Sequence, residues 1–349
     1  MPEKLILVPG PKEMPHFYPV GAPGRAWGDA ERDEWFAHAN KIQRSYDADV
    51  LVKVEALKAI FDVEQYGALS QDPQRYPLFV IKTKEFRVNA NANKPCILVT
   101  GGTHGYETSG VQGALLFAAK HMERYSKLYN IAVCPCISPW SYECVQRWNA
   151  KAIDPNRFFL PDSPCEECAA VVALISSMDV PQWLMHCDLH ETTDSDDSEF
   201  RPAKASRDGL PLAYESIPDG FYLIGNKLEP QAGWHKAMID AVAKVTHIAP
   251  PDANHQIVEL DQVQRGVVNS SSVGKGKGVA SALYGTTTEV YPDSKSKPVS
   301  GDMCNEAQVA AVVGGLDYII TTTNKNLLIR HTFLSDGVVQ YTLSNGNGL

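Results

Sequence analysis

The sequence predicts an α/β fold in which helices pack on both sides of a largely parallel central sheet. Short apolar runs rich in β-branched residues alternate along the chain with longer segments whose apolar residues recur at helical spacing. Two of the short runs lead directly into segments that contain histidine and carboxylate side chains, as expected where parallel strands end and ligands bind. The 349 residues contain no internal repeat and no low-complexity linker, so we expect one principal domain.

The expected elements follow one another in a simple order. Residues 1–41 are rich in proline and glycine, and we expect a loosely attached extended arm. Residues 42–325 would form the principal domain, and residues 326–349 a C-terminal tail that packs on it. Apolar spacing predicts helices over 42–61, 109–125, 168–178 and 305–321. Compact apolar or β-branched runs predict strands over 76–83, 95–100, 129–138, 183–190 and 280–291.

Composition and charge argue against several classes of function. The formal net charge is −9 and the 32 lysine and arginine residues are scattered, so we expect no surface for nucleic acid. No apolar run approaches the length of a membrane span or a signal-peptide core, so we expect no membrane association and a cytoplasmic location. Cys165 and Cys168 form a C-x-x-C pair without a second pair at zinc-ribbon spacing, which favours two reduced thiols.

The first segment with chemical character is "GGTHGYETSG", residues 101–110, which follows the strand expected at 95–100. His104 and Glu107 are three residues apart in a turn that leads into a helix, so both side chains can reach one ion. The glycines allow the backbone to turn sharply. Two histidines and one glutamate are a ligand set of hydrolytic zinc sites, so this segment predicts two of three metal ligands.

A third ligand is predicted at the end of another strand. In "MHCDLHETT" His190 closes the strand expected at 183–190, and His186 and Asp188 share its face by strand alternation. The acidic run at 191–199 lacks the glycine and glutamate positions of a calcium loop, and we interpret it as a solvated acidic loop. Histidines without an accompanying motif are interpreted as structural: His121, His235, His247, His255 and His331.

Two further segments carry candidate functional side chains. In "QRWNAKAIDPNRFF", residues 146–159, Arg147 and Arg157 flank Asn156 in a stretch without regular periodicity. Such a loop suits recognition of a carboxylate by guanidinium groups, although structural ion pairs remain the alternative. In "YGTTTEVYP" Glu289 is the one carboxylate in a strand that otherwise looks buried. Burial raises the pKa of a carboxyl group, which suits a general base, and a structural acid remains the alternative.

Taken together, these motifs resemble the zinc carboxypeptidase superfamily, which contains carboxypeptidase A/B-like peptidases and aspartoacylase/succinylglutamate desuccinylase-like deacylases. The resemblance rests on H-x-x-E, then R-x-N-A with D-x-N-R-x-F, then a D-L-H strand end, then T-x-E, in that order. It covers roughly residues 45–320. The fold that it implies is a three-layer α/β/α sandwich with a mixed, mainly parallel eight-stranded sheet.

The resemblance also implies roles for individual residues. His104, Glu107 and His190 would hold one zinc ion per chain. Glu289 would be the general base, and Arg147 would stabilise the oxyanion.

Three residues of the 146–159 segment complete the implied site. Asn156 and Arg157 would bind the free α-carboxylate of the substrate, and Asp154 would orient His104.

The implied activity is that of a zinc metallocarboxypeptidase acting on the C-terminal bond of peptides. The alternative is a zinc-dependent deacylase of N-acyl amino acids, which "GGTHGYETSG" resembles more closely. The length of chain before the zinc loop, and the short C-terminal part, favour the peptidase. Either substrate carries a free carboxylate. The tyrosine that the peptidases place before the catalytic strand has no counterpart in "VVNSSSVGKGKGVAS".

Overall fold

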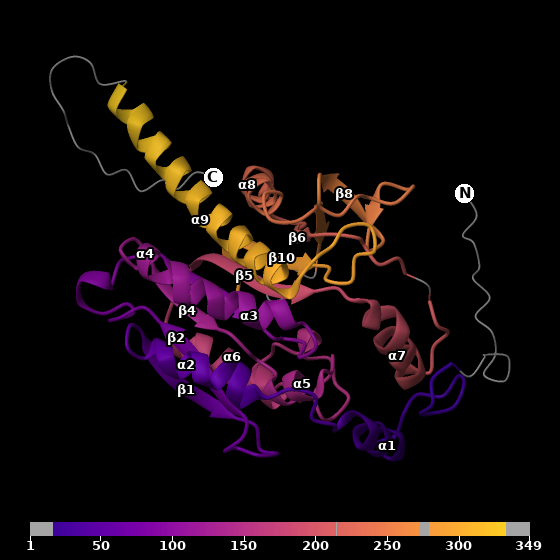
Figure 1. Ribbon diagram of the computed structural model, residues 1–349. Helices are drawn as coiled ribbons and strands as arrows, with labels where there is room; N and C mark the ends of the chain where they lie inside the picture. Colours follow the sequence, from indigo (N-terminus) through magenta and orange to yellow (C-terminus); the bar gives the residue numbers. More distant parts are fainter. Residues whose placement is uncertain (1–16, 214, 272–278, 333–349) are drawn as a thin grey trace.

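The computed structural model describes residues 17–213, 215–271 and 279–332, with side chains to residue 322 (Figure 1). Its described strands form one ten-stranded sheet in the order β1-β2-β4-β3-β5-β10-β6-β9-β8-β7. The α/β class and the mixed sheet are confirmed, whereas the predicted count of eight strands is wrong. The strands are β1 (Asp62–Ala68), β2 (Pro77–Lys82), β3 (Cys96–Gly101), β4 (Asn130–Cys134), β5 (Trp183–Glu191), β6 (Tyr222–Asn226), β7 (Gln256–Ile257), β8 (Leu260–Gln264), β9 (Val267–Ser270) and β10 (Ala282–Val290).

The parallel part of the sheet lies at its centre. Strands β4, β3, β5 and β10 run parallel to one another. On one side β2 and β1 join through antiparallel pairs. On the other side β6 pairs antiparallel with β10 and parallel with β9, and β9, β8 and β7 are antiparallel to one another in turn. Strands β3 and β4 were predictable because they are nearly continuous apolar runs buried on both faces. The edge strand β8, "LDQVQ", alternates between partly buried and exposed positions, so it lacks that signal.

Helices cover both faces of the sheet, and the side chains of β3 show how. Ile97 and Val99 belong to a core cluster that includes residues of α3, α8 and α9, whereas Cys96 and Leu98 belong to a cluster that includes residues of α6. Because successive side chains of a strand point to opposite faces of the sheet, β3 contributes to the hydrophobic core on each face. The helices are α1 (Asp29–Ala39), α2 (Val52–Leu57), α3 (Thr108–Phe117), α4 (Glu123–Ser126), α5 (Pro139–Cys144), α6 (Glu166–Ser177), α7 (Arg201–Asp208), α8 (Ala232–Val242) and α9 (Gly301–Thr332).

The N-terminal segment differs from the extended arm that its composition predicts. Residues 29–39 form α1, where the Glu31 carboxylate accepts a hydrogen bond of 2.8 Å from the Gly28 N–H at the start of the helix. Trp27 and Trp35 are buried against Trp148, so aromatic packing ties this segment to the domain. The prediction of extended structure is wrong for α1, and residues 1–16 lie outside the described part.

The C-terminal end is dominated by α9, which packs against α3 and α8 (Figure 1). The helix runs to Thr332, beyond the boundary expected at residue 326. Residues 333–349 lie outside the described part, so the packing of a tail stays a prediction. No helix among the described residues is both long and apolar enough to cross a membrane.

Candidate active site

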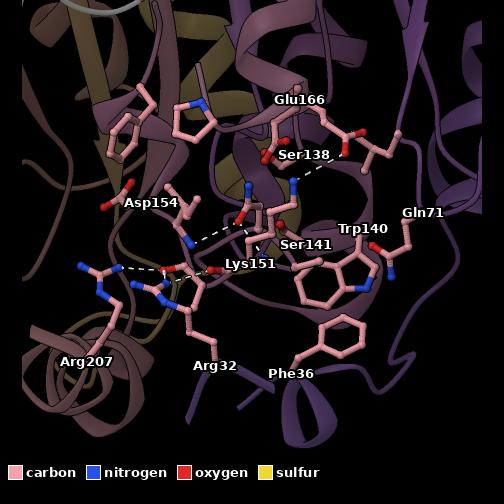
Figure 2. A pocket seen from close by; sticks show the side chains of 18 of the residues that line it. Arg32, Phe36, Gln71, Ser138, Trp140, Ser141, Lys151, Asp154, Glu166 and Arg207 are labelled. Atoms are coloured by element: carbon pink, nitrogen blue, oxygen red, sulfur yellow. Dashed lines mark hydrogen bonds and ion pairs between the residues drawn. The ribbon is translucent and has the colours of Figure 1, made fainter. Parts of the chain in front are cut away.

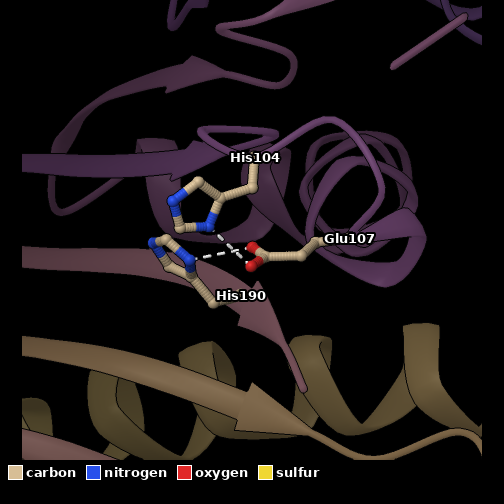
Figure 3. A group of neighbouring side chains, drawn as sticks. All are labelled: His104, Glu107 and His190. Atoms are coloured by element: carbon tan, nitrogen blue, oxygen red, sulfur yellow. Dashed lines mark hydrogen bonds and ion pairs between the residues drawn. The ribbon is translucent and has the colours of Figure 1, made fainter. Parts of the chain in front are cut away.

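The predicted metal ligands meet at the carboxyl ends of neighbouring parallel strands. His104 follows β3, Glu107 precedes the first residue of α3, and His190 lies near the end of β5. All three side chains are buried, and one donor atom of each lies within 4.8 Å of the other two. Nδ1 of His104 lies 2.7 Å from one carboxylate oxygen of Glu107, and Nδ1 of His190 lies 2.8 Å from the other (Figure 3). The two imidazoles and the carboxylate thus converge on one point.

Close backbone packing explains the glycines of this loop. A Cβ atom at Gly105 would lie 1.9 Å from the carbonyl carbon of Ser141 on α5. Gly102 has a φ of +64°, which side-chain-bearing residues rarely adopt. The loop can therefore present His104 to the site only because these two positions lack a side chain.

The outer nitrogen of each imidazole is held by a separate carboxylate. Nε2 of His104 lies 3.0 Å from Asp154, the residue predicted to orient it, and Nε2 of His190 lies 2.8 Å from Asp188. Thr100 donates a 2.7 Å hydrogen bond to Asp188 and thereby fixes that carboxylate. Such contacts hold an imidazole in one orientation and leave Nδ1 to face the ligand point.

The ligand cluster suits a cation. The ion-pair distance between Glu107 and His190 is short, yet Oε2 of Glu107 has no hydrogen-bond partner of acceptable geometry. Burial would raise the pKa of Glu107, but the charges of His190 and His104 lower it to about 2. Two imidazole nitrogens and one ionised carboxylate at this spacing match the donor set of hydrolytic zinc sites, so the residues present fit a zinc ion.

Arg147 lies beside this cluster. Its guanidinium donates a 3.2 Å hydrogen bond to the Tyr106 hydroxyl and lies 3.4 Å from Asp154 and 3.5 Å from Asp196. The Tyr106 hydroxyl in turn donates to Asp196 at 2.8 Å. Burial opposes the charged form of Arg147, but these carboxylates, Asp154 foremost, outweigh it and raise the pKa of Arg147. The network holds a positive charge in place at the cleft.

Glu289 lies on β10, directly opposite His190 in the register of β5 and β10. Thr192 donates a 3.0 Å hydrogen bond to its carboxylate, and the Thr192 hydroxyl also lies 3.0 Å from the Tyr222 hydroxyl. Burial, followed by the charge of Glu107, raises the pKa of Glu289 to about 8. A carboxyl group in this range can both accept and donate a proton near neutral pH.

Asn156 and Arg157 lie on a short 3-10 turn, Pro155–Arg157, whose first N–H groups are capped by Asp154. Arg157 is exposed, and the ion pairs of the described residues give it no carboxylate partner; one guanidinium nitrogen donates to the Asn156 carbonyl oxygen at 3.1 Å. All eight predicted site residues line one cleft of about 290 Å³. They are His104, Glu107, Arg147, Asp154, Asn156, Arg157, His190 and Glu289.

The cleft also contains residues that sequence reasoning did not assign. Strand alternation had placed Asp188 on the face of His190 but gave it no role. The acidic run after His190 is not simply solvated, because Glu191 and Asp196 are buried. Glu191 accepts a hydrogen bond of 2.8 Å from the Ser109 N–H at the start of α3. Tyr106 and Tyr222 had no sequence signal, since their roles depend on partners distant in the chain. Residues 272–278, within the segment that lacks the expected tyrosine, lie outside the described part.

Comparisons with known proteins agree with this architecture. No protein-family model matches the sequence, and no curated protein matches it. Among solved structures, provisionally described metallopeptidases from Shewanella amazonensis, Shewanella denitrificans and Shewanella baltica superpose with TM-scores of 0.57, 0.56 and 0.53. This chain has the fold of those metallopeptidases. The identities are 17%, 15% and 14%; the matches cover 78%, 78% and 85% of this chain and 91%, 88% and 98% of the other chains.

The shared metallopeptidase fold accounts for where the cleft lies. In an α/β sheet, ligands bind beyond the carboxyl ends of parallel strands. In this chain β3, β5 and β10 end together, with Gly101 opposite Leu189 and Glu289 opposite His190. The fold therefore brings residues from three distant parts of the sequence to one edge.

Proposed function

We propose that the protein is a zinc metallocarboxypeptidase that hydrolyses the C-terminal peptide bond of peptides. The observation that carries the proposal is the convergence of three buried ligand atoms within 4.8 Å of one another in a cleft that also contains Glu289 and Arg147. A metal-ligand set, a proton-transfer group and a fixed cation are the parts that amide hydrolysis needs.

His104, Glu107 and His190 would hold the zinc ion, one per chain. When bound, zinc lowers the pKa of water and polarises a carbonyl group. Asp154 and Asp188 keep the two imidazoles turned toward the ligand point by holding their outer nitrogens at 3.0 and 2.8 Å.

Glu289 is the proton carrier. Its carboxylate accepts the proton of the attacking water and later delivers it to the nitrogen of the leaving amine. The single hydrogen bond from Thr192 orients one carboxylate oxygen, while burial and the charge of Glu107 keep the pKa of Glu289 high enough for the proton to be returned.

Arg147 supplies positive charge where the carbonyl oxygen becomes an anion. Its tethers to Tyr106, Asp154 and Asp196 fix the guanidinium before the substrate binds. Farther along the cleft, Arg157 offers a guanidinium without a carboxylate partner among the described residues, and Asn156 lies beside it. A free α-carboxylate would satisfy both, which limits cleavage to the terminal bond.

Mass-spectrometric product analysis tests the proposal. Zinc-loaded protein is incubated with matched peptides that end in a free carboxylate or in an amide, together with a set of N-acyl amino acids. We expect release of the last residue from the free peptides only. Chelated protein and the Glu289→Gln variant are the matched inactive controls.

The deacylase alternative has a distinct outcome in the same experiment. The cleft of about 290 Å³ is small and would accommodate an N-acyl amino acid, whose carboxylate would meet the same Arg157. If zinc-loaded protein cleaved the N-acyl amino acids and left every peptide intact, the peptidase proposal would be replaced by deacylation.

A further inference from the structure

A second and larger cavity, of about 970 Å³, is lined on one side by residues of the loop 149–158. Figure 2 shows Lys151 and Asp154 of this loop at the cavity. Asp154 and Arg157 line this cavity and the catalytic cleft, so the loop forms the wall between them. The other walls come from α1, α5, the segment 69–71, the start of α6 and the end of α7. None of the proposed catalytic steps uses this space.

The dividing loop is held in place by contacts from two helices. Arg32 of α1 donates to the Lys151 carbonyl oxygen at 3.0 Å, and Arg207 of α7 donates to the Ala152 carbonyl oxygen at 3.1 Å. Inside the loop the Asn149 side chain accepts the N–H groups of residues 151 and 153 at 3.0 and 3.1 Å. These hydrogen bonds pre-form the cavity, which lowers the cost of ordering it around a ligand.

The buried part of the lining contains an unsatisfied acid. Glu167, on α6, is 3% exposed, and its Oε1 atom has no hydrogen-bond partner. Its neighbour Glu166 is different, because it accepts two hydrogen bonds from Ser70, at 2.7 and 2.6 Å. A buried polar atom without a partner costs free energy that a donor group on a ligand would recover.

The charges of the lining favour a cation. Acids outnumber bases in the lining, which contains Asp29, Asp33, Asp154, Glu166, Glu167 and Asp208 against Arg32, Lys151, Arg157 and Arg207. Arg207 pairs with Asp208, and Lys151 lies 3.9 Å from Glu166. On the exposed rim, Asp29 and Asp33 belong to α1 and have no ion-pair partner among the described residues. The acids of the lining without an ion-pair partner among the described residues are therefore Glu167 inside the cavity and Asp29 and Asp33 at its rim.

The lining also contains apolar side chains. Phe36 and Trp140 stack with ring centroids 5.7 Å apart, and Leu69 and Phe158 line the same cavity. An aliphatic chain would bury its methylene groups here, and a protonated amine is attracted to aromatic faces.

We propose that this cavity is a binding site for a small aliphatic diamine. One ammonium group hydrogen-bonds to Glu167, the methylene chain lies against Phe36 and Trp140, and the second ammonium group meets Asp29 and Asp33 at the rim. The proposed ligand contacts include none of the proposed catalytic groups, although Asp154 and Arg157 form the wall shared with the cleft. The proposal does not depend on the proposed peptidase activity because binding is measured without turnover.

Isothermal titration calorimetry with 1,5-diaminopentane tests the proposal on the full-length protein. We expect saturable binding with one site per chain, weaker binding of 1-aminopentane, and none of 1,5-pentanediol or glutarate. Glu167→Gln should weaken diamine binding about tenfold through loss of the buried charge-assisted hydrogen bond, and Asp33→Asn about threefold, since the rim is solvated. Glu306→Gln, which removes an exposed carboxylate on α9, is the matched control and should leave affinity unchanged.

A second variant, which leaves Glu167 in place, tests the site independently in case Glu167→Gln does not fold. Gln71 is exposed at the cavity (Figure 2), so Gln71→Trp should narrow the mouth and weaken binding about tenfold while circular dichroism stays unchanged. Diamine affinity equal to wild type in both Glu167→Gln and Gln71→Trp would overturn the proposal, as would binding no tighter than that of 1,5-pentanediol. Loss of binding in Glu289→Gln, with Glu167→Gln unaffected, would place the diamine in the catalytic cleft and would equally overturn it.

Discussion

The two cavities of this protein share a wall but differ in how their polar groups are paired. In the candidate active-site cleft nearly every buried charge has a fixed partner: Asp154 and Asp188 each hold an imidazole, and Arg147 is held by a tyrosine and two acids. In the larger cavity Glu167 is buried with one oxygen unpaired. Pre-paired charges suit a site whose groups must act in one geometry, whereas a buried acid without a partner at one oxygen can accept a hydrogen bond from a ligand.

The sharpest test of the cleft separates proton transfer from metal binding. Glu289→Gln should lower kcat by about 10³-fold or more, because an amide cannot take the proton of water. Zinc content should stay at one ion per chain, since Glu289 is outside the ligand set. His190→Ala should instead lose the metal. Elemental analysis and kinetics of both variants distinguish loss of proton transfer from loss of metal. Equal loss of zinc in the two variants would show that the base is misassigned.

A second test concerns the fixed cation. Arg147→Ala should lower kcat by about 10²-fold with little change in KM, because the charge acts on the developing oxyanion. Arg124→Ala, at an exposed arginine that pairs with Asp317, is the control. A rise in KM at unchanged kcat would mean that Arg147 binds the ground-state substrate instead.

A smaller effect is expected from the carboxylate that holds His190. Asp188→Asn keeps the shape of the side chain but loses the charge on the outer imidazole nitrogen, so zinc affinity should fall about 10- to 100-fold. Competition with a chromogenic chelator measures this directly. Asp208→Asn, on an acid that pairs with Arg207 and lies outside the cleft, should leave zinc affinity at the wild-type value. Unchanged affinity in Asp188→Asn would limit Asp188 to a structural role.

The smallest effect concerns the unpaired acid of the larger cavity. Burial raises the pKa of Glu167 to about 7 in the folded protein, above its ordinary value of 4.5. The folded state therefore binds the proton more tightly than the unfolded state, and stability falls as pH rises from 4.5 to 7. Glu167→Gln should be more stable than wild type at pH 8 by on the order of 2 kcal/mol, with the difference vanishing near pH 4. Thermal unfolding across this range measures it; a difference independent of pH would contradict the assignment.

The predicted site residues line one cleft, and they could be predicted because their patterns are local in the sequence. H-x-x-E before a helix, a histidine at a strand end and a lone glutamate among threonines are short-range signals, and their residues line one cleft. Strands β3 and β4 were predictable for a similar reason, since strands buried on both faces are nearly continuous apolar runs. Strands β1 and β6 to β9 escaped prediction; of these, β7, β8 and β9 are short or half-exposed.

Tertiary structure alone decided the remaining features. Composition predicts an extended N-terminal arm, but Trp27 and Trp35 find an aromatic partner in Trp148, more than one hundred residues away, and α1 forms against it. Arg32 of that helix donates a hydrogen bond to the Lys151 carbonyl oxygen in the loop that separates the two cavities. Glu167 gave no signal in the sequence, because being buried without a partner is a property of the folded environment. The sequence by itself determined which residues could bind a metal; long-range packing decided what surrounds them and created the cavity behind them.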